Sequence, residues 1–461
     1  MSEAVGGTGG RSADGPDDGY TAVSRRARDL ARSFGWFGSA NVLANLLGYV
    51  ATIVLSRGLS PAEFGAAGAL LAVGMLAAVP ASTLQLVVAS RVARAVVDTT
   101  ISVRQVSPTA LLIGAFLTLL AAIGLRPLSD YLHLASSWPA LMVVLTLGPT
   151  AVGGAYQGLL LGHGAFNRLA VAIMVTATSR VVAMVLALSL GAGLTGVLAA
   201  ICAASVLSAL VTAWLARARS EPARAVAPMW RDLAHGSVLL TGFFVLSNLD
   251  IPLARHQLGG SESGLYVLGA IFAKACLWGP QFLAVLAYPR LARSSDPRRV
   301  LLVVMAMVAG LGLLAAAAAA VAGGWLAVAM SGPEYAGVGR LAAGFAVLGT
   351  LWALLHVVVL SHIANAGRLA SAGVWVAVAA EVAVIHRMGA SATPGSILAV
   401  AVGAAAGAVL LASVPALRGA WPPDREAPGT PDLAELALPD GPLPATATGP
   451  RAPDAGGTTP R

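Results

Sequence analysis

The sequence has few charged residues. Only 11% of its 461 residues are Asp, Glu, Lys or Arg, whereas 57% are hydrophobic. A soluble globular protein carries about 25% charged residues. A surface with so few charges cannot face water on every side, which excludes an ordinary soluble domain.

Cysteine and lysine are also scarce. The two cysteines, Cys202 and Cys276, lie in apolar runs far apart in the sequence. We interpret them as packing residues and expect neither a disulfide framework nor a metal site. Of the 29 basic residues 28 are arginine, and most lie between apolar runs. That distribution is typical of membrane-protein loops, so the net charge of +8 predicts no nucleic-acid partner.

Long apolar runs are abundant. Runs of about 20 residues recur between residues 34 and 415, and each is long enough to cross a hydrocarbon core about 30 Å thick. Only helices or a closed barrel satisfy their backbone there, and continuous hydrophobicity selects helices. We predict an all-α integral membrane protein with about twelve transmembrane helices, at 34–56, 64–88, 107–125, 138–160, 168–190, 193–215, 236–256, 264–288, 299–323, 339–362, 369–388 and 391–415.

These spans divide the chain into two lobes of six helices, residues 34–215 and 236–415, joined by a cytoplasmic loop at 216–235. Residues 1–33 are Gly-rich and polar, and we expect them to form a disordered cytoplasmic tail. They lack the early apolar core that a signal peptide would have. Residues 416–461 are expected to form a second disordered tail, since ten of the 26 prolines lie beyond residue 418.

Loop arginines predict the orientation. Thirteen arginines fall in loops after even-numbered spans and five in loops after odd-numbered spans. Cytoplasmic loops carry the excess of basic residues, so we expect both termini in the cytoplasm.

The two halves also resemble each other at an offset of 199 residues. L59-S-P-A-E-F-G65 matches L258-G-G-S-E-S-G264, and R91-V-A-R94 matches R290-L-A-R293. Both copies begin on the cytoplasmic side, so the repeats are parallel and related by a pseudo-twofold axis along the membrane normal. Two six-helix bundles facing each other across a cavity are typical of a transporter.

The stretch N41-V-L-A-N-L-L-G-Y-V-A-T-I-V-L-S-R-G-L-S-P-A-E-F-G65 resembles the opening of Wzx-type polysaccharide biosynthesis proteins. These belong to the multidrug/oligosaccharidyl-lipid/polysaccharide (MOP) exporter superfamily. Three further segments are similar: Q157-G-L-L-L-G-H-G-A-F-N-R168, G264-L-Y266 with P289-R-L291, and G332-P-E-Y335. The resemblance covers about residues 30–415. It implies a carrier that moves lipid-linked oligosaccharides across the cytoplasmic membrane of a bacterium by alternating access between two six-helix lobes.

Two basic residues are expected near mid-membrane, where a charge costs at least about 2.5–3.5 kcal/mol. Arg180 lies in the fifth span, and no acidic residue lies inside a span of its own lobe. Lys274 lies in the eighth span. We predict that both bind an anionic substrate group. The alternative is that Arg180 joins a buried ion pair and that Lys274 is neutralised by Asp250 or Glu381.

Two acidic residues are candidates for ion coupling. Asp250 lies beside Pro252, which removes a backbone hydrogen bond and leaves an irregular turn. Pairing of Asp250 with Arg255 would be the structural alternative. Glu381, in the eleventh span, is the second candidate.

Further candidates lie on the first, second, seventh and eighth spans. Arg57 and Arg255 end equivalent spans, and they either line the outer mouth of the cavity or extend to the lipid headgroups. The remaining candidates are polar residues able to touch sugar hydroxyls or join helices, and prolines as hinges: Asn41, Asn45, Pro80, Pro252 and Pro280.

Enzyme motifs are missing. The sequence contains no G-x-x-x-x-G-K-[ST] phosphate-binding loop, and no soluble segment is long enough for a glycosyltransferase domain. We therefore expect a carrier without cofactors, driven by an ion gradient, the membrane potential or product removal. Its partners would be the bilayer, an anionic lipid-linked glycan and polysaccharide synthesis enzymes. A multidrug/cation antiporter of the same superfamily and a non-transporting scaffold of a polysaccharide synthesis complex are the alternatives.

Overall fold

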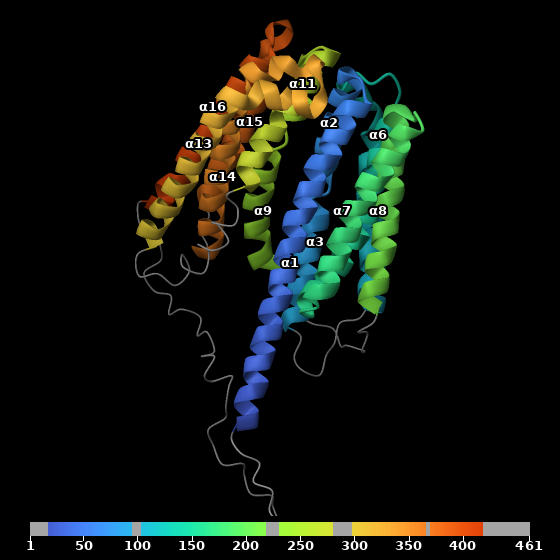
Figure 1. Cartoon of the computed structure of the whole chain (residues 1–461), viewed down its shortest axis with the longest axis vertical. Coiled ribbons are helices and arrows are strands. Elements are labelled where there is room, and N and C mark those ends of the chain that lie inside the picture. Colours follow the sequence, from blue (N-terminus) through green and yellow to red (C-terminus); the bar gives the residue numbers. More distant parts are fainter. Residues whose placement is uncertain (1–16, 95–102, 218–229, 280–296, 366–368, 418–461) are drawn as a thin grey trace, which may run out of the picture. The chain divides into compact units, whose positions relative to one another are not determined.

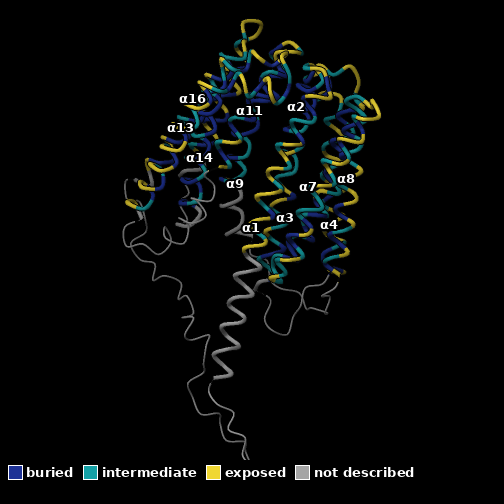
Figure 2. The backbone as a smooth tube through the Cα atoms, viewed as in Figure 1, coloured by how far each residue is buried: buried dark blue, intermediate teal, exposed yellow. Residues whose placement is uncertain are grey.

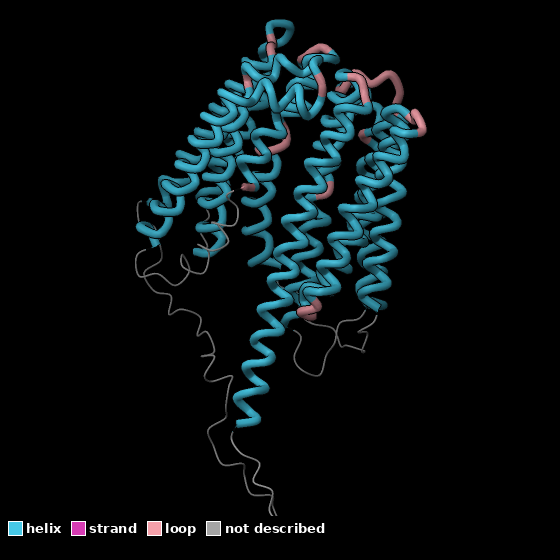
Figure 3. The backbone as a smooth tube through the Cα atoms, in the orientation of Figure 1, coloured by secondary structure: helices cyan, strands magenta, loops and turns pink. Residues whose placement is uncertain are grey.

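The computed structural model describes residues 17–94, 103–217, 230–279, 297–365 and 369–417. Within these ranges the secondary structure is helical, without strands (Figure 3). Eleven helical segments in the described ranges are long and apolar enough to cross a membrane. The predicted all-α membrane fold is therefore confirmed. The expected eighth span, 264–288, continues beyond residue 279 and so lies partly outside the described residues.

The first half forms the N-lobe (Figure 1, blue to green). It contains α1 (Asp17–Gly58), α2 (Pro61–Ala77), α3 (Val79–Arg94), α4 (Val103–Ile123), α5 (Leu125–Tyr131), α6 (Trp138–Gly162), α7 (Phe166–Ser189) and α8 (Gly193–Arg217). The second half forms the C-lobe (yellow to red). It contains α9 (Trp230–Leu246), α10 (Asp250–Gln257), α11 (Gly260–Trp278), α13 (Pro297–Ser331), η1 (Pro333–Arg340), α14 (Ala342–Asn365), α15 (Leu369–Met388), η2 (Gly389–Ser391) and α16 (Pro394–Leu417).

Several helices extend beyond the expected spans. α1 begins at Asp17, so residues 17–33 are helical and not part of a disordered tail. Its first turn is acidic, which suits the positive end of the helix dipole, and the residues that follow are rich in Ala and Arg. α9 begins at Trp230, inside the expected loop 216–235. The polar residues before the apolar runs of α1 and α9 are therefore part of these helices and not of the preceding loops.

Two spans are interrupted close to a proline. The second span breaks at Ala78, between α2 and α3, with Pro80 just beyond the break. The seventh breaks between α9 and α10. Pro252 cannot donate a hydrogen bond to the carbonyl four residues before it, which belongs to Asn248 at that break.

The start of α2 follows from a local signal. The Ser60 hydroxyl accepts a hydrogen bond from the Glu63 amide at 3.4 Å, and the Ser60 amide donates to Glu63 Oε2 at 3.1 Å. Pro61 occupies the first helical turn. This reciprocal capping box ends α1 and begins α2 within a few residues.

Each lobe packs around a central helix. α6 contacts α3, α4 and α8 in the N-lobe, and α14 contacts α11, α13 and α16 in the C-lobe. Buried and exposed positions alternate along the outer helices (Figure 2). Val321 is 90% exposed and Leu190 is 82% exposed. Apolar side chains exposed to this degree are stable against lipid, as expected of a membrane-spanning bundle.

The lobes meet where α2 packs against α11. A Cβ atom on Gly65 would collide with Ser263 and the backbone of Gly264, and a Cβ atom on Gly264 would collide with the Pro61 carbonyl. Gly65 and Gly264 are the matching glycines of the two repeats, 199 residues apart. The repeat read from the sequence thus corresponds to a reciprocal contact between the lobes.

Candidate functional site

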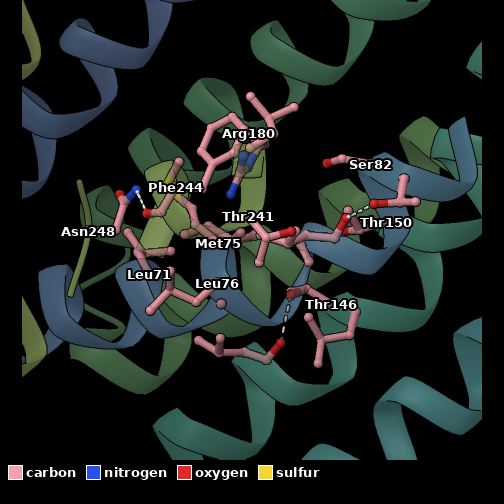
Figure 4. Close-up of a pocket in the computed structure, with 18 of the residues that line it drawn as sticks. Leu71, Met75, Leu76, Ser82, Thr146, Thr150, Arg180, Thr241, Phe244 and Asn248 are labelled. Carbon is pink, nitrogen blue, oxygen red and sulfur yellow. Dashed lines mark hydrogen bonds between the residues drawn. The ribbon is translucent and has the colours of Figure 1, made fainter. Parts of the chain in front are cut away.

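A cavity of about 440 Å³ lies between the lobes. Its wall is formed by α2, α3, α6, α7 and α8 of the N-lobe, and by α9 and the break after it in the C-lobe (Figure 4). Both helix breaks contribute to the wall, through Ala78 and Asn248. Irregular backbone inside a membrane protein is tolerated where it lines such a cavity.

The lining is mainly apolar, with a group of hydroxyls and an amide. The Thr83 and Thr146 hydroxyls donate to carbonyls of their own helices, at 3.2 and 2.6 Å. Their oxygen lone pairs remain available to a bound molecule. The polar uncharged residues of the lining are Ser82, Thr83, Thr146, Thr150, Thr241 and Asn248.

Arg180 is the charged residue among those that line the cavity. It lies on α7, and its guanidinium group points into the cavity beside Thr241 and Phe244 (Figure 4). Its side chain is exposed, and no described residue forms a hydrogen bond or ion pair with it. Because a guanidinium group at this depth needs a counter-charge or water, the structure leaves it available for an anion.

Lys274 lies behind the cavity wall. Its ammonium group donates a 2.6 Å hydrogen bond to Asn248 Oδ1, and Asn248 itself lines the cavity. The Asn248 amide is held in turn by the Phe244 carbonyl and by Ser247 Oγ, at 2.9 and 3.2 Å. Lys274 therefore reaches the cavity through Asn248. It forms no hydrogen bond with Asp250 or Glu381, but it interacts electrostatically with Asp250.

Asp250 and Glu381 form a buried acidic cluster with Tyr266 in the C-lobe. The exposed fractions of Asp250 and Glu381 are 0% and 1%. The Tyr266 hydroxyl donates to Asp250 Oδ2 at 3.0 Å. Asp250 Oδ1 and both Glu381 oxygens lack hydrogen-bond partners among the described residues, and the two carboxyl groups interact electrostatically. The Lys274 ammonium group interacts electrostatically with Asp250. A second buried carboxylate is costly unless a further cation binds or one of the two carboxylates is protonated.

Arg255 does not pair with Asp250. It donates to the Leu132 and Ala62 carbonyls and to Ser263 Oγ, at 3.1, 3.2 and 3.0 Å. Arg57 likewise donates to backbone carbonyls, those of Met330 and Ala329. Neither arginine is among the residues that line the cavity.

The other candidate residues occupy varied positions. Asn41 donates to the Phe37 carbonyl of its own helix at 3.1 Å, and Asn45 is exposed. Neither lines the cavity. Pro80 and Pro252 flank the two helix breaks, whereas Pro280 lies outside the described residues.

Sequence reasoning did not single out the hydroxyl residues of the wall or Tyr266. Thr146 and Thr150 lie four residues apart on α6 and both reach the cavity. Residues at this spacing share one face of a helix. Threonines repeated at helical spacing within an apolar run were therefore an available signal.

No group of three or more His, Cys, Asp or Glu side chains in the described ranges is arranged to hold a metal ion.

Solved structures share this architecture. The chain superposes on the inward-facing conformation of a multidrug resistance MATE family transporter of the MOP superfamily with a TM-score of 0.63 and 14% identity, covering 81% of this chain and 94% of that one. For the eukaryotic MATE transporter AtDTX14 the TM-score is 0.62 and the identity 12%, and the superposition covers 86% of this chain and 96% of that one. For a MOP superfamily transporter from Pyrococcus furiosus the TM-score is 0.56 and the identity 17%, and the superposition covers 85% of this chain and 94% of that one. The chain thus shares the fold of these transporters.

The sequence comparison is more specific. The family model for polysaccharide biosynthesis proteins matches residues 30–255. Over these residues the chain therefore carries the pattern of that family, and the resemblance to polysaccharide biosynthesis proteins identified from the sequence is confirmed in this range. A comparison with curated proteins gives no match.

Proposed function

We propose that the protein carries an anionic lipid-linked oligosaccharide, or a related envelope polysaccharide precursor, across the cytoplasmic membrane of a bacterium by alternating access. The observation that carries this proposal is the Arg180 guanidinium group, which lies in a cavity between the lobes and has no hydrogen-bond or ion-pair partner among the described residues. A guanidinium group binds phosphate oxygens in a bidentate manner. The hydroxyl-bearing residues of the wall would bind the adjacent sugar.

The size of the cavity limits what it holds. Pockets for drug-sized ligands measure roughly 300–1,000 Å³, and this cavity measures about 440 Å³. It suits a phosphate group and the nearest sugar, not a complete lipid-linked oligosaccharide. In this proposal the lipid chain remains in the bilayer.

The buried acidic cluster supplies the coupling to an ion in this proposal. Asp250 and Glu381 would take up a proton or a monovalent cation, which offsets the cost of burying two carboxylates. Asp250 lies two residues from Asn248, which lines the cavity and binds Lys274. Uptake of positive charge would thus alter the electrostatic potential next to the bound anion.

Charge substitutions at the two basic residues test the proposal. In proteoliposomes carrying a labelled lipid-linked oligosaccharide, Arg180→Gln and Lys274→Gln should lower transport at least tenfold with little loss of folded protein. Arg180→Lys should keep part of the activity, because the charge remains and the bidentate fork is lost. Arg387→Gln, which removes an exposed arginine from the last turn of α15, is the matched control. Arg180→Gln with wild-type transport would contradict the proposal.

A multidrug or cation antiporter is the second candidate, because MATE transporters share the fold. A cavity for organic cations should present carboxylates, whereas the charged residue lining this cavity is Arg180. Efflux of a cationic dye that survives Arg180→Gln would favour the antiporter. A non-transporting scaffold would also tolerate Arg180→Gln, but it would move neither the dye nor the glycan.

A further inference from the structure

The lobes are joined at the end of the bundle where α1 ends and α2 begins, here called the distal end. Arg57, in the last turn of α1, donates from Nε to the Met330 carbonyl at 2.7 Å and from Nη2 to the Ala329 carbonyl at 2.5 Å. Both carbonyls belong to the last turn of α13 in the C-lobe. Carbonyls of a last helical turn lack partners within the helix and carry the negative end of its dipole, so they bind a cation well.

Arg255 makes the same kind of contact in the opposite direction. It lies in the last turn of α10 in the C-lobe and donates to the carbonyls of Leu132 and Ala62 in the N-lobe. Leu132 directly follows α5, after the third span of the N-lobe, and α13 is the third span of the C-lobe. Each lobe therefore ends its first span with an arginine that donates to backbone carbonyls of the other lobe. Arg57 binds the end of the third span of the C-lobe, and Arg255 binds the end of the short helix that follows the third span of the N-lobe.

Further contacts surround these two arginines. The Ser56 and Ser331 hydroxyls are 2.7 Å apart across the lobes, and the Tyr335 hydroxyl lies 3.5 Å from the Ser56 carbonyl. Burial, with a contribution from Glu334, raises the pKa of Tyr335 to about 12, so its hydroxyl remains a donor at neutral pH. On the other side, the His256 ring stacks on Tyr131 with centroids 3.9 Å apart.

We propose that Arg57 and Arg255 form a reciprocal latch that closes the distal end and must open in every transport cycle. The inference rests on alternating access in the proposed function, and it assigns these residues a role other than substrate binding. Backbone carbonyls suit such a latch, because at the end of a span water replaces the arginine when the lobes separate. The latch is uneven: Arg57 is exposed, whereas Arg255 is 9% exposed. Loss of Arg255 should therefore have the larger effect.

A reversible cross-link tests whether the latch must open. Cys202 and Cys276 are first replaced by serine, and Ser56→Cys is then combined with Ser331→Cys. The two hydroxyls are 2.7 Å apart, so the thiols are placed to form a disulfide. Oxidation should abolish transport, and a reductant should restore it, while each single cysteine variant stays active. A fully cross-linked protein that transports at the uncross-linked rate would overturn the proposal.

Distal accessibility gives a second test that needs no substrate. Val267→Cys, in the same cysteine-free background, places a thiol in the closed interface opposite Gly68. Arg57→Ala and Arg255→Ala should raise its maleimide labelling at least threefold, and the lysine variants should raise it less. Arg126→Ala removes an exposed distal arginine and is the control. Labelling unchanged in Arg57→Ala would contradict the latch even if Arg255→Ala failed to fold, and it would leave the glycan proposal intact.

Discussion

Gly65 of α2 and Gly264 of α11 lie against each other across the pseudo-twofold axis of the molecule, and neither position has room for a Cβ atom. The next pair along the same helices, Gly68 and Val267, is also separated by 199 residues and in contact. The matching segments of the repeat are therefore the surfaces through which the lobes touch.

This contact predicts the effect of enlarging either glycine. Gly65→Val and Gly264→Val should hold the distal end open, because the new side chain collides with backbone atoms that cannot move aside. Overpacking of this kind costs about 1–3 kcal/mol. Transport should fall severalfold, and labelling of a cysteine at position 267 should rise.

Gly403→Val is the matched control for the glycine variants, since open space surrounds that position on α16. Wild-type transport by Gly65→Val would show that close packing of α2 on α11 is dispensable.

Neutral substitutions of the two buried acids should abolish the coupling of transport to an ion gradient without preventing the protein from folding. Asp250→Asn and Glu381→Gln keep the side-chain volume and remove a buried charge. We expect transport that no longer responds to an imposed proton or sodium gradient, measured in proteoliposomes. Stability should hold or rise, because a neutral amide avoids the cost of burying a charged carboxylate.

Glu262→Gln, in the first turn of α11, removes an exposed acid and should leave the gradient response unchanged. A response that persists in both Asp250→Asn and Glu381→Gln would exclude the acidic cluster from coupling.

Reporter fusions test the orientation. The thirteen-to-five arginine bias places residue 225 in the cytoplasm and residues 130 and 260 outside. A phosphatase fused after residue 130 or 260 should be active, and one fused after residue 225 inactive. Activity at residue 225 would reverse the orientation and place the latch on the cytoplasmic side.

The positions of the spans and the break near Pro252 were predictable because they depend on local properties. Apolar length decides whether a segment crosses the membrane, and a proline removes a specific backbone hydrogen bond. The helix over residues 17–33 was not predicted, because its polar composition indicated disorder, although its alanines and arginines favour a helix.

In the candidate site, too, the residues could be predicted from local properties, whereas their surroundings could not. Arg180 and Lys274 could be selected from sequence alone, because a charge inside an apolar run is costly whatever surrounds it. Their environments could not be predicted. Arg180 faces a cavity and has no partner in the part of the chain that the structure describes, and Lys274 binds Asn248 within the C-lobe. Both depend on how the helices are turned against one another.

The sequence by itself determined a helical membrane protein with a parallel repeat and a small set of intramembrane charges. Amino-acid composition and the spacing of the repeat can be read from the chain without its tertiary structure. Only the tertiary structure decided that Arg57 and Arg255 bind across the lobes. Their partners are backbone carbonyls, which every residue possesses and no sequence pattern distinguishes. Which carbonyl lies within reach of an arginine is set by the packing of the two lobes.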